Sequence, residues 1–539
     1  MRQWTVLFMV AAGFGAGIAC YYYLSAKPVA PPPVVPVAAS TSANAAAVVE
    51  QAKPKIERPK LFPSGAKPDL CLLFSGEMYG YLQPCGCTRP QVGGLERRFE
   101  LIKELQDKGI PVSAVDLGDL AAHETGRQPR MKFEFALQML QKMPYSAIGL
   151  GVTEFDMTAE EALALALNYQ PPAVLAANLL DPDSKRFAGM YKAWTTAQPD
   201  PKGLKVGYVG LIGDTVIKLA MAKDKTLQFD PPEKALPKAL EELKKEKPDV
   251  LVLVLQGTPA EAKQLFEKFP DTFHILFSRA DADVPSALPT RLKNPSGHES
   301  LLVNVGQKGR AVGLVAVNRA EKWLELRYQM VELVEPYELP DNETNPVREL
   351  MKDYVLAVYR EDLLSKVPIS DHPIQRTPGF ENAAFVGAAK CQECHPTAHK
   401  IWSGAKHFLA TTNLAKYGRP LAEMPVKDGK PQIIGREYDP ECASCHVTGF
   451  GLKSGFIDYK KSPHLLGNQC ENCHGPGSLH VADAKNTKYS TPMRLSIEDP
   501  LTEKRCRLCH DADNDPHFDL RKYWEQIKHG KEQTPPPGK

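Results

Sequence analysis

Four copies of one pentapeptide constrain this chain of 539 residues more than any other feature. Each copy reads Cys-x-x-Cys-His, and the first, second, third and fourth motifs begin at Cys391, Cys442, Cys470 and Cys506. Two thiols one helical turn apart can bond the two vinyl groups at one edge of a porphyrin, and the following histidine then lies under the iron as its proximal ligand. The pattern predicts four covalently attached haem c groups.

The motifs name the predicted haem contacts directly. The attaching thiols are Cys391, Cys394, Cys442, Cys445, Cys470, Cys473, Cys506 and Cys509. The proximal iron ligands are His395, His446, His474 and His510. A four-thiolate zinc site or a set of disulfides would also use these cysteine pairs, but neither explains a histidine after every pair.

The same region supplies candidates for the second, distal iron ligand. Between residues 386 and 539 there are six further histidines but only two methionines, Met424 and Met493. This inventory favours two histidines per iron and hence lower reduction potentials, because methionine is the ligand that raises them. The distal candidates are His399, His407, His464, His480, His517 and His529. The region is short for four prosthetic groups, so the haems are expected to form its apolar interior.

Three segments around the motifs carry a family resemblance: Trp402–His407, Leu466–His480, and Tyr523 and Trp524 followed by His529. Over roughly residues 385–532 the chain resembles the tetrahaem cytochromes that carry electrons in hydroxylamine oxidation by ammonia oxidisers. The resemblance implies that His407, His480 and His529 are distal ligands. It also implies one haem whose sixth position is open or weakly held, unless His399, His464 or His517 closes it.

Upstream, short apolar runs alternate with amphipathic stretches from about residue 68 to 335, which is typical of an α/β layered sheet. The predicted strands are Leu70–Phe74, Val112–Asp116, Ser146–Gly149, Ala173–Ala177, Lys205–Gly210, Asp249–Leu255, Phe273–Phe277, Leu301–Val305 and Ala311–Asn318. Predicted helices include Leu95–Asp107, Met131–Lys142 and Ala235–Glu246. The last strands are close in sequence and are expected to pair antiparallel. The chain is thus expected to join an α/β unit to a haem-packed, mostly α-helical or irregular domain.

The strand ends carry Phe74–Gly80, Asp116–Asp119 and Gly151–Asp156, which resemble the calcineurin-like metallophosphoesterases, in particular the 5′-nucleotidase branch. That resemblance implies a site for two metal ions. Histidines of the family pattern are absent here, and only Asp119 and Glu77 remain as residual metal-site carboxylates. Two carboxylates cannot hold two hard metal ions, so no functional dinuclear site is expected and the domain is predicted to be non-catalytic.

Cys85 and Cys87 lie in the loop after the first predicted strand. Ligands bind beside such loops in α/β sheets. One interpretation is a structural disulfide, including a bond from one of the two to Cys71. The other is a redox-active dithiol or a thiolate ligand. The sequence leaves both open.

The first 24 residues are apolar apart from Arg2, and residues 4–24 are long enough to anchor the chain in a membrane. A cleaved signal peptide and lipidation at Cys20 are the alternatives, and all three place the rest of the chain outside the cytoplasm, as in the periplasm. Residues 25–67 read as a Pro/Ala-rich linker, 336–385 as a connecting segment around a helix at Val347–Leu364, 386–532 as the tetrahaem domain, and 533–539 as a disordered tail.

The charge balance, 66 Lys and Arg against 64 Asp and Glu, offers no nucleic-acid footprint. The sequence therefore predicts a membrane-tethered, extracytoplasmic electron carrier with redox proteins as partners, whose α/β domain serves for docking. One alternative is an oxidoreductase acting on a small nitrogen or sulfur compound at an open haem or at the Cys85/Cys87 loop. A second is a metal-dependent phosphoesterase or nucleotidase fused to a cytochrome.

Overall fold

The computed structural model describes residues 56–85, 89–182, 185–280, 282–284, 286–414, 419–420 and 433–530. The expected N-terminal anchor, most of the linker, Cys87 and the side chain of Cys85 lie outside the described residues. Within the described part, no helix combines the length and apolar character needed to cross a membrane. Cys71 is a free thiol, fully buried in the core, so the disulfide considered for it is absent.

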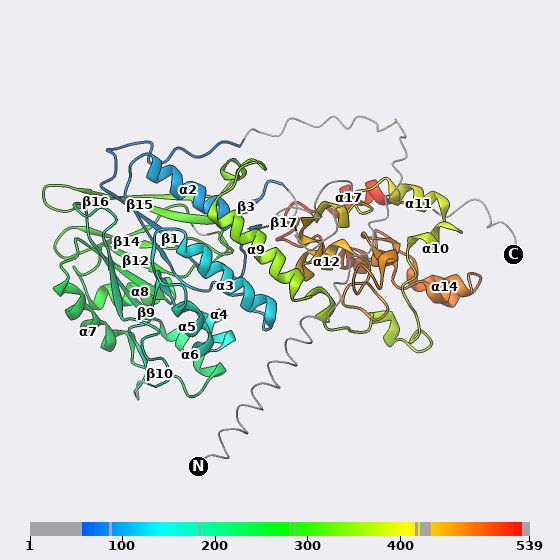
Figure 1. The fold of residues 1–539 in the computed structure, drawn as a ribbon, viewed down its shortest axis with the longest axis horizontal. Helices are drawn as coiled ribbons and strands as arrows, with labels where there is room; N and C mark the ends of the chain where they lie inside the picture. Colours follow the sequence, from blue (N-terminus) through cyan, green and yellow to red (C-terminus); the bar gives the residue numbers. More distant parts are fainter. Residues whose placement is uncertain are drawn as a thin grey trace, which may run out of the picture.

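Two six-stranded sheets form the α/β unit (Figure 1). The first has the order β16 (Leu324–Glu332), β15 (Ala311–Arg319), β1 (Leu70–Ser75), β4 (Val112–Asp116), β5 (Tyr145–Gly149), β6 (Ala173–Leu175). The second has the order β13 (Thr290–Lys293), β14 (Glu299–Val303), β12 (Ile275–Ser278), β11 (Val250–Gln256), β9 (Val206–Ile212), β8 (Trp194–Ala197). Strands β1, β4, β5 and β6 run parallel, as do β9, β11, β12 and β14, and antiparallel strands complete each sheet.

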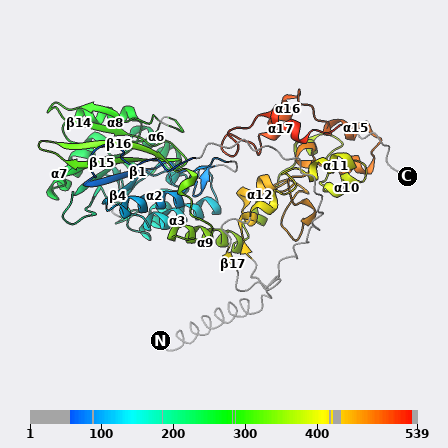
Figure 2. The same ribbon diagram turned by 90° about the horizontal axis from the view of Figure 1, so that it is seen from above.

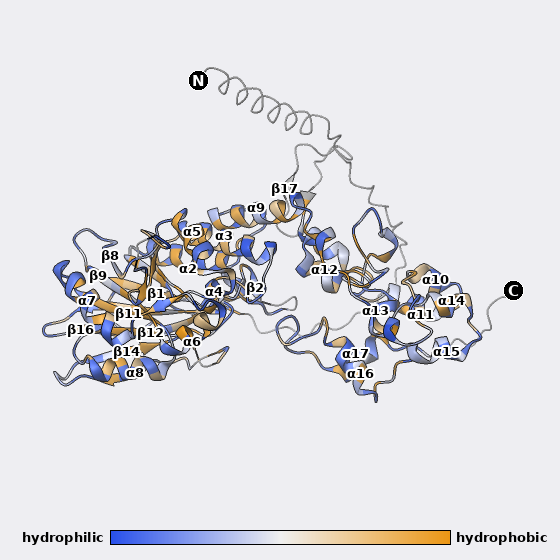
Figure 3. Cartoon of the chain, turned by 90° about the horizontal axis from the view of Figure 1, so that it is seen from below, coloured by the Kyte–Doolittle hydropathy of each residue, from blue (hydrophilic) through white to orange (hydrophobic). Residues whose placement is uncertain are grey.

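The sheets pack face to face and helices cover their outer sides. Alternate residues of both sheets, such as Leu72, Phe74, Val252 and Phe277, meet in a buried layer, where the rings of Phe74 and Phe277 lie 5.1 Å apart. The helices of the unit are α2 (Leu95–Asp107), α3 (Arg127–Gln141), α4 (Val152–Met157), α5 (Ala159–Leu167), α6 (Asp214–Lys223), α7 (Pro232–Lys245) and α8 (Pro259–Lys268). The predicted α/β layered architecture is therefore confirmed, and its strands form the apolar centre seen in Figure 3.

The connecting segment that follows β16 packs its helix on the α/β unit. This helix, α9 (Pro346–Arg360), begins after the cap Asn345 and ends before the predicted Leu364. Val347, Met351, Tyr354, Val355 and Val358 are buried in the core on the outer side of the first sheet. Helix α9 is thus a layer of the α/β unit, whereas Leu364 and Phe385 of the same segment belong to the C-terminal cluster.

The C-terminal part consists of short helices joined by irregular chain (Figures 1 and 2). They are α10 (Ala388–Gln392), α11 (Pro396–Ser403), α12 (Pro440–His446), α13 (Cys470–His474), α14 (Ser478–Ala482), α15 (Thr487–Ser490), α16 (Pro500–Cys506) and α17 (Leu520–Ile527). Its apolar cluster is small: Leu364, Phe385, Ala443, Val447, Phe456 and Leu465 are its buried members. Side-chain packing alone gives this part little to fold around.

Small strand pairs complete the described residues. Strand β2 (Pro84–Cys85) pairs with β3 (Val92–Gly93), β7 (Leu179–Leu180) with β10 (Gln228–Phe229), and β17 (Arg419–Pro420) with β18 (Ile433–Ile434). The first of these hairpins contains the backbone of Cys85, which follows β1 in the sequence.

Candidate functional site

Each Cys-x-x-Cys-His motif starts on or forms a short helix, the local conformation that brings two cysteines three positions apart to one side. The second motif lies in α12 and the third forms α13, whereas the first begins in α10 and the fourth begins at the last residue of α16. Helix α12 opens with the cap Asp439, whose carboxylate accepts a hydrogen bond from the Glu441 amide at 3.0 Å, followed by Pro440. Both are favourable helix starts.

Three of the four proximal histidines face a second histidine ring. Ring centres are 6.2 Å apart for His395 and His480, 6.1 Å for His407 and His510, and 5.8 Å for His474 and His529. Two imidazoles that bind one metal ion from opposite sides, each through a bond of about 2 Å, place their ring centres about 6 Å apart. The structure thus places each of the three histidines that the family resemblance implied as distal ligands against the histidine of a different motif.

His446, the proximal histidine of the second motif, has a different environment. Its Nδ1 lies 2.6 Å from the Ala410 carbonyl oxygen. Among the described residues, no second histidine ring is found against it, and Met424 lies outside them. The chain therefore pairs three motif histidines and leaves one without a histidine partner in the described part.

The other distal candidates are placed elsewhere. His399 packs edge-on against Trp402, with ring centres 5.1 Å apart. For His464 and His517, no ring contact with a motif histidine is found in the described part of the chain. Met493 accepts from His474 Nδ1 through its backbone carbonyl at 2.5 Å.

Hydrogen bonds fix the orientation of three of the four motif histidines. Besides the carbonyl contacts of His446 and His474, His510 Nδ1 lies 2.7 Å from Asp515 Oδ2, and Phe518 stacks on the His510 ring at 4.9 Å. An imidazole that donates its Nδ1 hydrogen to an acceptor presents Nε2 as the ligand atom, and an acidic acceptor raises its basicity. Asp515 is buried, and sequence reasoning missed it because its link to His510 depends on the fold of the intervening turn.

A cavity of about 1220 Å³ lies between these groups. Its lining includes His407, His474, His480, His510, Cys473 and Cys509. His480 Nδ1 is buried without a hydrogen-bond partner. His372, from the segment before the motifs, also lines it. The donors and the space fit porphyrins bonded at the motif thiols.

The motifs are not adjacent in the order of the sequence. Beside the first motif, the Ala388 amide donates to Gln469 Oε1, next to the third motif, at 2.6 Å. Arg505, beside the fourth motif, donates to the Cys473 carbonyl at 2.9 Å. The Cys445 thiol of the second motif lies 4.0 Å from the Leu508 carbonyl of the fourth. The third motif thus lies beside the first and the fourth, and the second lies beside the fourth and, through Asn472, beside the third.

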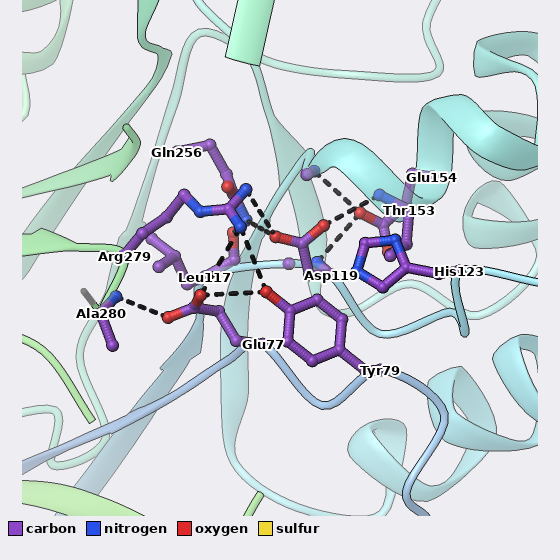
Figure 4. A network of polar contacts seen from close by, with 12 residues as sticks. Glu77, Tyr79, Leu117, Asp119, His123, Thr153, Glu154, Gln256, Arg279 and Ala280 are labelled. Atoms are coloured by element: carbon purple, nitrogen blue, oxygen red, sulfur yellow. Dashed lines mark hydrogen bonds and ion pairs between the residues drawn. The ribbon is translucent and has the colours of Figure 1, made fainter. Parts of the chain in front are cut away.

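A second polar cluster, around Glu77 and Asp119, lies at the carboxyl ends of the strands of the α/β unit (Figure 4). Glu77, Tyr79 and Asp119 follow β1 and β4 with left-handed backbone angles (φ of 50°, 49° and 56°). Strained residues of this kind cluster at functional sites. The backbone of Gly151 lies close to the Asp119 carboxylate, because a Cβ at position 151 would lie 2.5 Å from Asp119 Oδ1.

Arg279 occupies the space between the two carboxylates that the sequence identified. Its guanidinium lies 3.2 Å from Asp119 Oδ2 and 3.7 Å from Glu77 Oε1, and it donates to the Tyr79 hydroxyl at 3.1 Å. Asp119 also accepts from the Thr153 amide at 2.9 Å. A cation of the chain itself therefore lies between the two carboxylates. Sequence reasoning noted only that the histidines of the family pattern are absent, and it missed Arg279.

Burial determines the protonation of this cluster. Glu154 is buried and accepts from the backbone amides of Asp119, Leu120 and Gly151 at 3.0, 2.8 and 2.8 Å. Burial, with the nearby Asp119 carboxylate, raises the pKa of Glu154 to about 7. Burial also raises the pKa of Glu77 to about 7, although the Ala280 amide and Arg279 oppose the shift. The cluster therefore holds protons near neutral pH.

Comparison with known proteins agrees with the C-terminal site. Residues 390–475 match the family described as cytochrome c554 and c-prime. The chain is 30% identical over 141 residues to cytochrome c-554 of Nitrosomonas europaea. The match covers 24% of this chain and 58% of the length of that relative. The C-terminal part is thus similar to multihaem c-type cytochromes, as its motifs predict.

The chain is also similar in structure to phosphoesterase-type proteins. A 5′-nucleotidase precursor from Thermus thermophilus matches with a TM-score of 0.45 and 18% identity, over 56% of this chain and 61% of that one. The NAD nucleotidase of Haemophilus influenzae matches with a TM-score of 0.43 and 16% identity, over 57% of this chain and 64% of that one.

Proposed function

We propose that this protein is an extracytoplasmic multihaem c-type cytochrome that transfers electrons between redox proteins. The three paired histidines support the proposal most strongly, because each pair joins a proximal histidine to one that the sequence resemblance implied as distal. The family match over residues 390–475 supports it independently. Four haems attached at the four motifs, with low potentials at the bis-histidine sites, follow from the same residues.

In this proposal the chain holds the haems and orients the histidines that bind them, while haem iron supplies the one-electron chemistry. The motif thiols would hold the porphyrins, and the histidine pairs would bind the iron. Met493 and Asp515 orient the rings of His474 and His510 through contacts with the Nδ1 atoms of these histidines. Contacts between neighbouring motifs would bring the haems close enough to exchange electrons.

The α/β unit acts, in this proposal, as a scaffold without hydrolytic activity, since Arg279 fills the place between Glu77 and Asp119. An N-terminal membrane tether and redox protein partners remain part of the proposal. A second candidate function, oxidation or reduction of a small ligand, is favoured by the single observation that His446 faces no histidine among the described residues.

The decisive experiment is mass spectrometry with absorption spectroscopy of the purified protein. We expect added mass for four haems, three low-spin ferric haems and one high-spin haem that binds cyanide. A polypeptide at its bare mass would overturn the proposal. Turnover of a nitrogen or sulfur compound at the high-spin haem would favour the second candidate, and metal-dependent phosphoester hydrolysis would overturn the scaffold role.

A further inference from the structure

We infer that the α/β unit positions the second and fourth haem motifs, and that Gln128 and Lys132 of α3 are positioning residues for the second. The inference rests on the proposed function, because it takes the motifs as haem sites. It goes further by giving the α/β unit a defined part in the haem centre. Four sets of contacts carry it.

The first contact is at the N-terminus of α12, the helix that holds the second motif. Its cap, Asp439, is 1% exposed. Gln128 Nε2 of the α/β unit donates to Asp439 Oδ1 at 2.7 Å and lies 3.0 Å from the Tyr354 hydroxyl of α9. A residue of α3 therefore holds the carboxylate that starts α12.

The second contact lies one residue before the first thiol of that motif. Lys132 Nζ of α3 lies 2.7 Å from Glu441 Oε1, and the lysine side chain is only 12% exposed. Beside it, Tyr359 of α9 packs edge-on against Tyr438, with ring centres 4.7 Å apart. Because α12 is short, its placement fixes the two thiols and His446 together.

The third contact concerns the fourth motif. Asp513 lies three residues after His510 and accepts from Lys308 Nζ at 2.8 Å, Arg310 at 3.0 Å and the Tyr81 hydroxyl at 2.9 Å. All three donors belong to the α/β unit. The Lys308 amide also donates to the Glu77 carbonyl at 2.8 Å. The fourth motif is therefore attached next to the Glu77 and Arg279 cluster.

The fourth contact joins the two positioned motifs to each other, through Cys445 and the Leu508 carbonyl at 4.0 Å. In Figures 1 and 2, α12 lies toward the α/β unit, whereas α10 lies on the side away from it, as does α14 in Figure 1. The α/β unit thus holds the end of the haem group that contains His446, the motif histidine without a described histidine partner. Removing a group that orients a metal ligand typically lowers metal affinity or activity 10–100-fold.

The test uses the full-length haem-loaded protein with Gln128→Ala and Lys132→Ala. We expect the dissociation constant of cyanide at the high-spin haem to change by about tenfold, with a shifted potential of that haem and unchanged spectra of the low-spin haems. Arg130→Ala is the matched control: Arg130 lies on the same helix but pairs with Glu161 inside the α/β unit, and we expect no change.

A double-mutant cycle tests whether Lys132→Ala acts through the loss of its ion pair with Glu441. Glu441→Gln should reproduce the shift of Lys132→Ala, and the double variant should show no further shift, since both remove one pair. Unchanged cyanide binding and unchanged haem potentials in Gln128→Ala and Lys132→Ala would overturn the inference. If the wild-type protein has no high-spin haem, the open coordination of the second haem in the proposed function is wrong. The haem potentials of the variants would then decide whether the inference holds.

Discussion

At the scale of single residues, Arg279 has the clearest energetic role in the α/β unit. Glu77 and Asp119 are 1% and 0% exposed, and the guanidinium lies between them. Removing one partner of a buried ionic group leaves charge without compensation. The stability of the cluster therefore depends on this arginine.

Arg279→Met is expected to destabilise the α/β unit by about 3–5 kcal/mol. The measurement is hydrogen exchange of the β1 and β4 amides in the haem-loaded protein. Arg291→Met is the control, since its pair with Glu299 is exposed, and should cost less than about 1 kcal/mol. Equal effects of the two variants would contradict a buried ionic cluster.

The same cluster predicts a pH dependence. Folding raises the pKa of both Glu77 and Glu154 to about 7, so the folded state binds more protons than the unfolded state between roughly pH 4.5 and 7. Their stabilising contribution is complete below this window and is lost as the pH rises through it. The hydrogen-exchange protection of the β1 amides should decline over this pH range, and it should decline less in the Glu77→Gln variant. A steeper decline in the variant would show that the sign is wrong.

The distal histidines give a spectroscopic prediction. His407→Ala, His480→Ala and His529→Ala should each convert one low-spin haem to high spin, because each removes one member of a ring pair. His399→Ala, His464→Ala and His517→Ala are matched controls and should leave the spectrum unchanged. Electron paramagnetic resonance of the ferric proteins distinguishes the two groups, and a new high-spin haem in a control variant would refute the pairing.

At the scale of elements, the sequence predicts the strands that are buried on both faces. Such strands read as continuous apolar runs, and β4 and α2 have the predicted bounds. Strand β16 was not predicted because it is half-buried and carries polar residues along its length. The motif residues could be named from spacing alone. The sequence could not predict which distal histidine pairs with which motif, because these pairs join segments that are distant in the chain. It could not predict the role of Arg279 for the same reason.

Helix α9 gives a prediction at the same scale. Met351 is buried in the core against the first sheet, so Met351→Ala should destabilise the α/β unit by about 2–5 kcal/mol. Arg360→Ala, on an exposed position of the same helix, should have little effect. Thermal unfolding followed by circular dichroism compares them. If both variants melt like the wild type, α9 is a connection and not a layer of the unit.

At the scale of the whole molecule, the two parts differ in what holds them together. The α/β unit has extensive cores on both faces of its sheets. The C-terminal part has one small cluster and a cavity of about 1220 Å³. An unfilled cavity loses the contacts that its lining would make. The haems are therefore expected to contribute most of the packing of this part.

Protein produced without haem attachment should keep only the α/β unit folded. Limited proteolysis should then yield a resistant fragment that contains both sheets and α9, with rapid loss of the region from residue 386 onward. The haem-loaded protein, digested in parallel, should resist cleavage in both parts. A protease-resistant C-terminal part in the haem-free protein would contradict the dependence on haem.

The crossed pairing of histidines also has a consequence for biosynthesis. His480 and His529, which meet His395 and His474, lie after later motifs, whereas His407 lies well before the His510 that it meets. In the proposed function, the first and third haems would therefore complete their coordination only after these later residues have been synthesised.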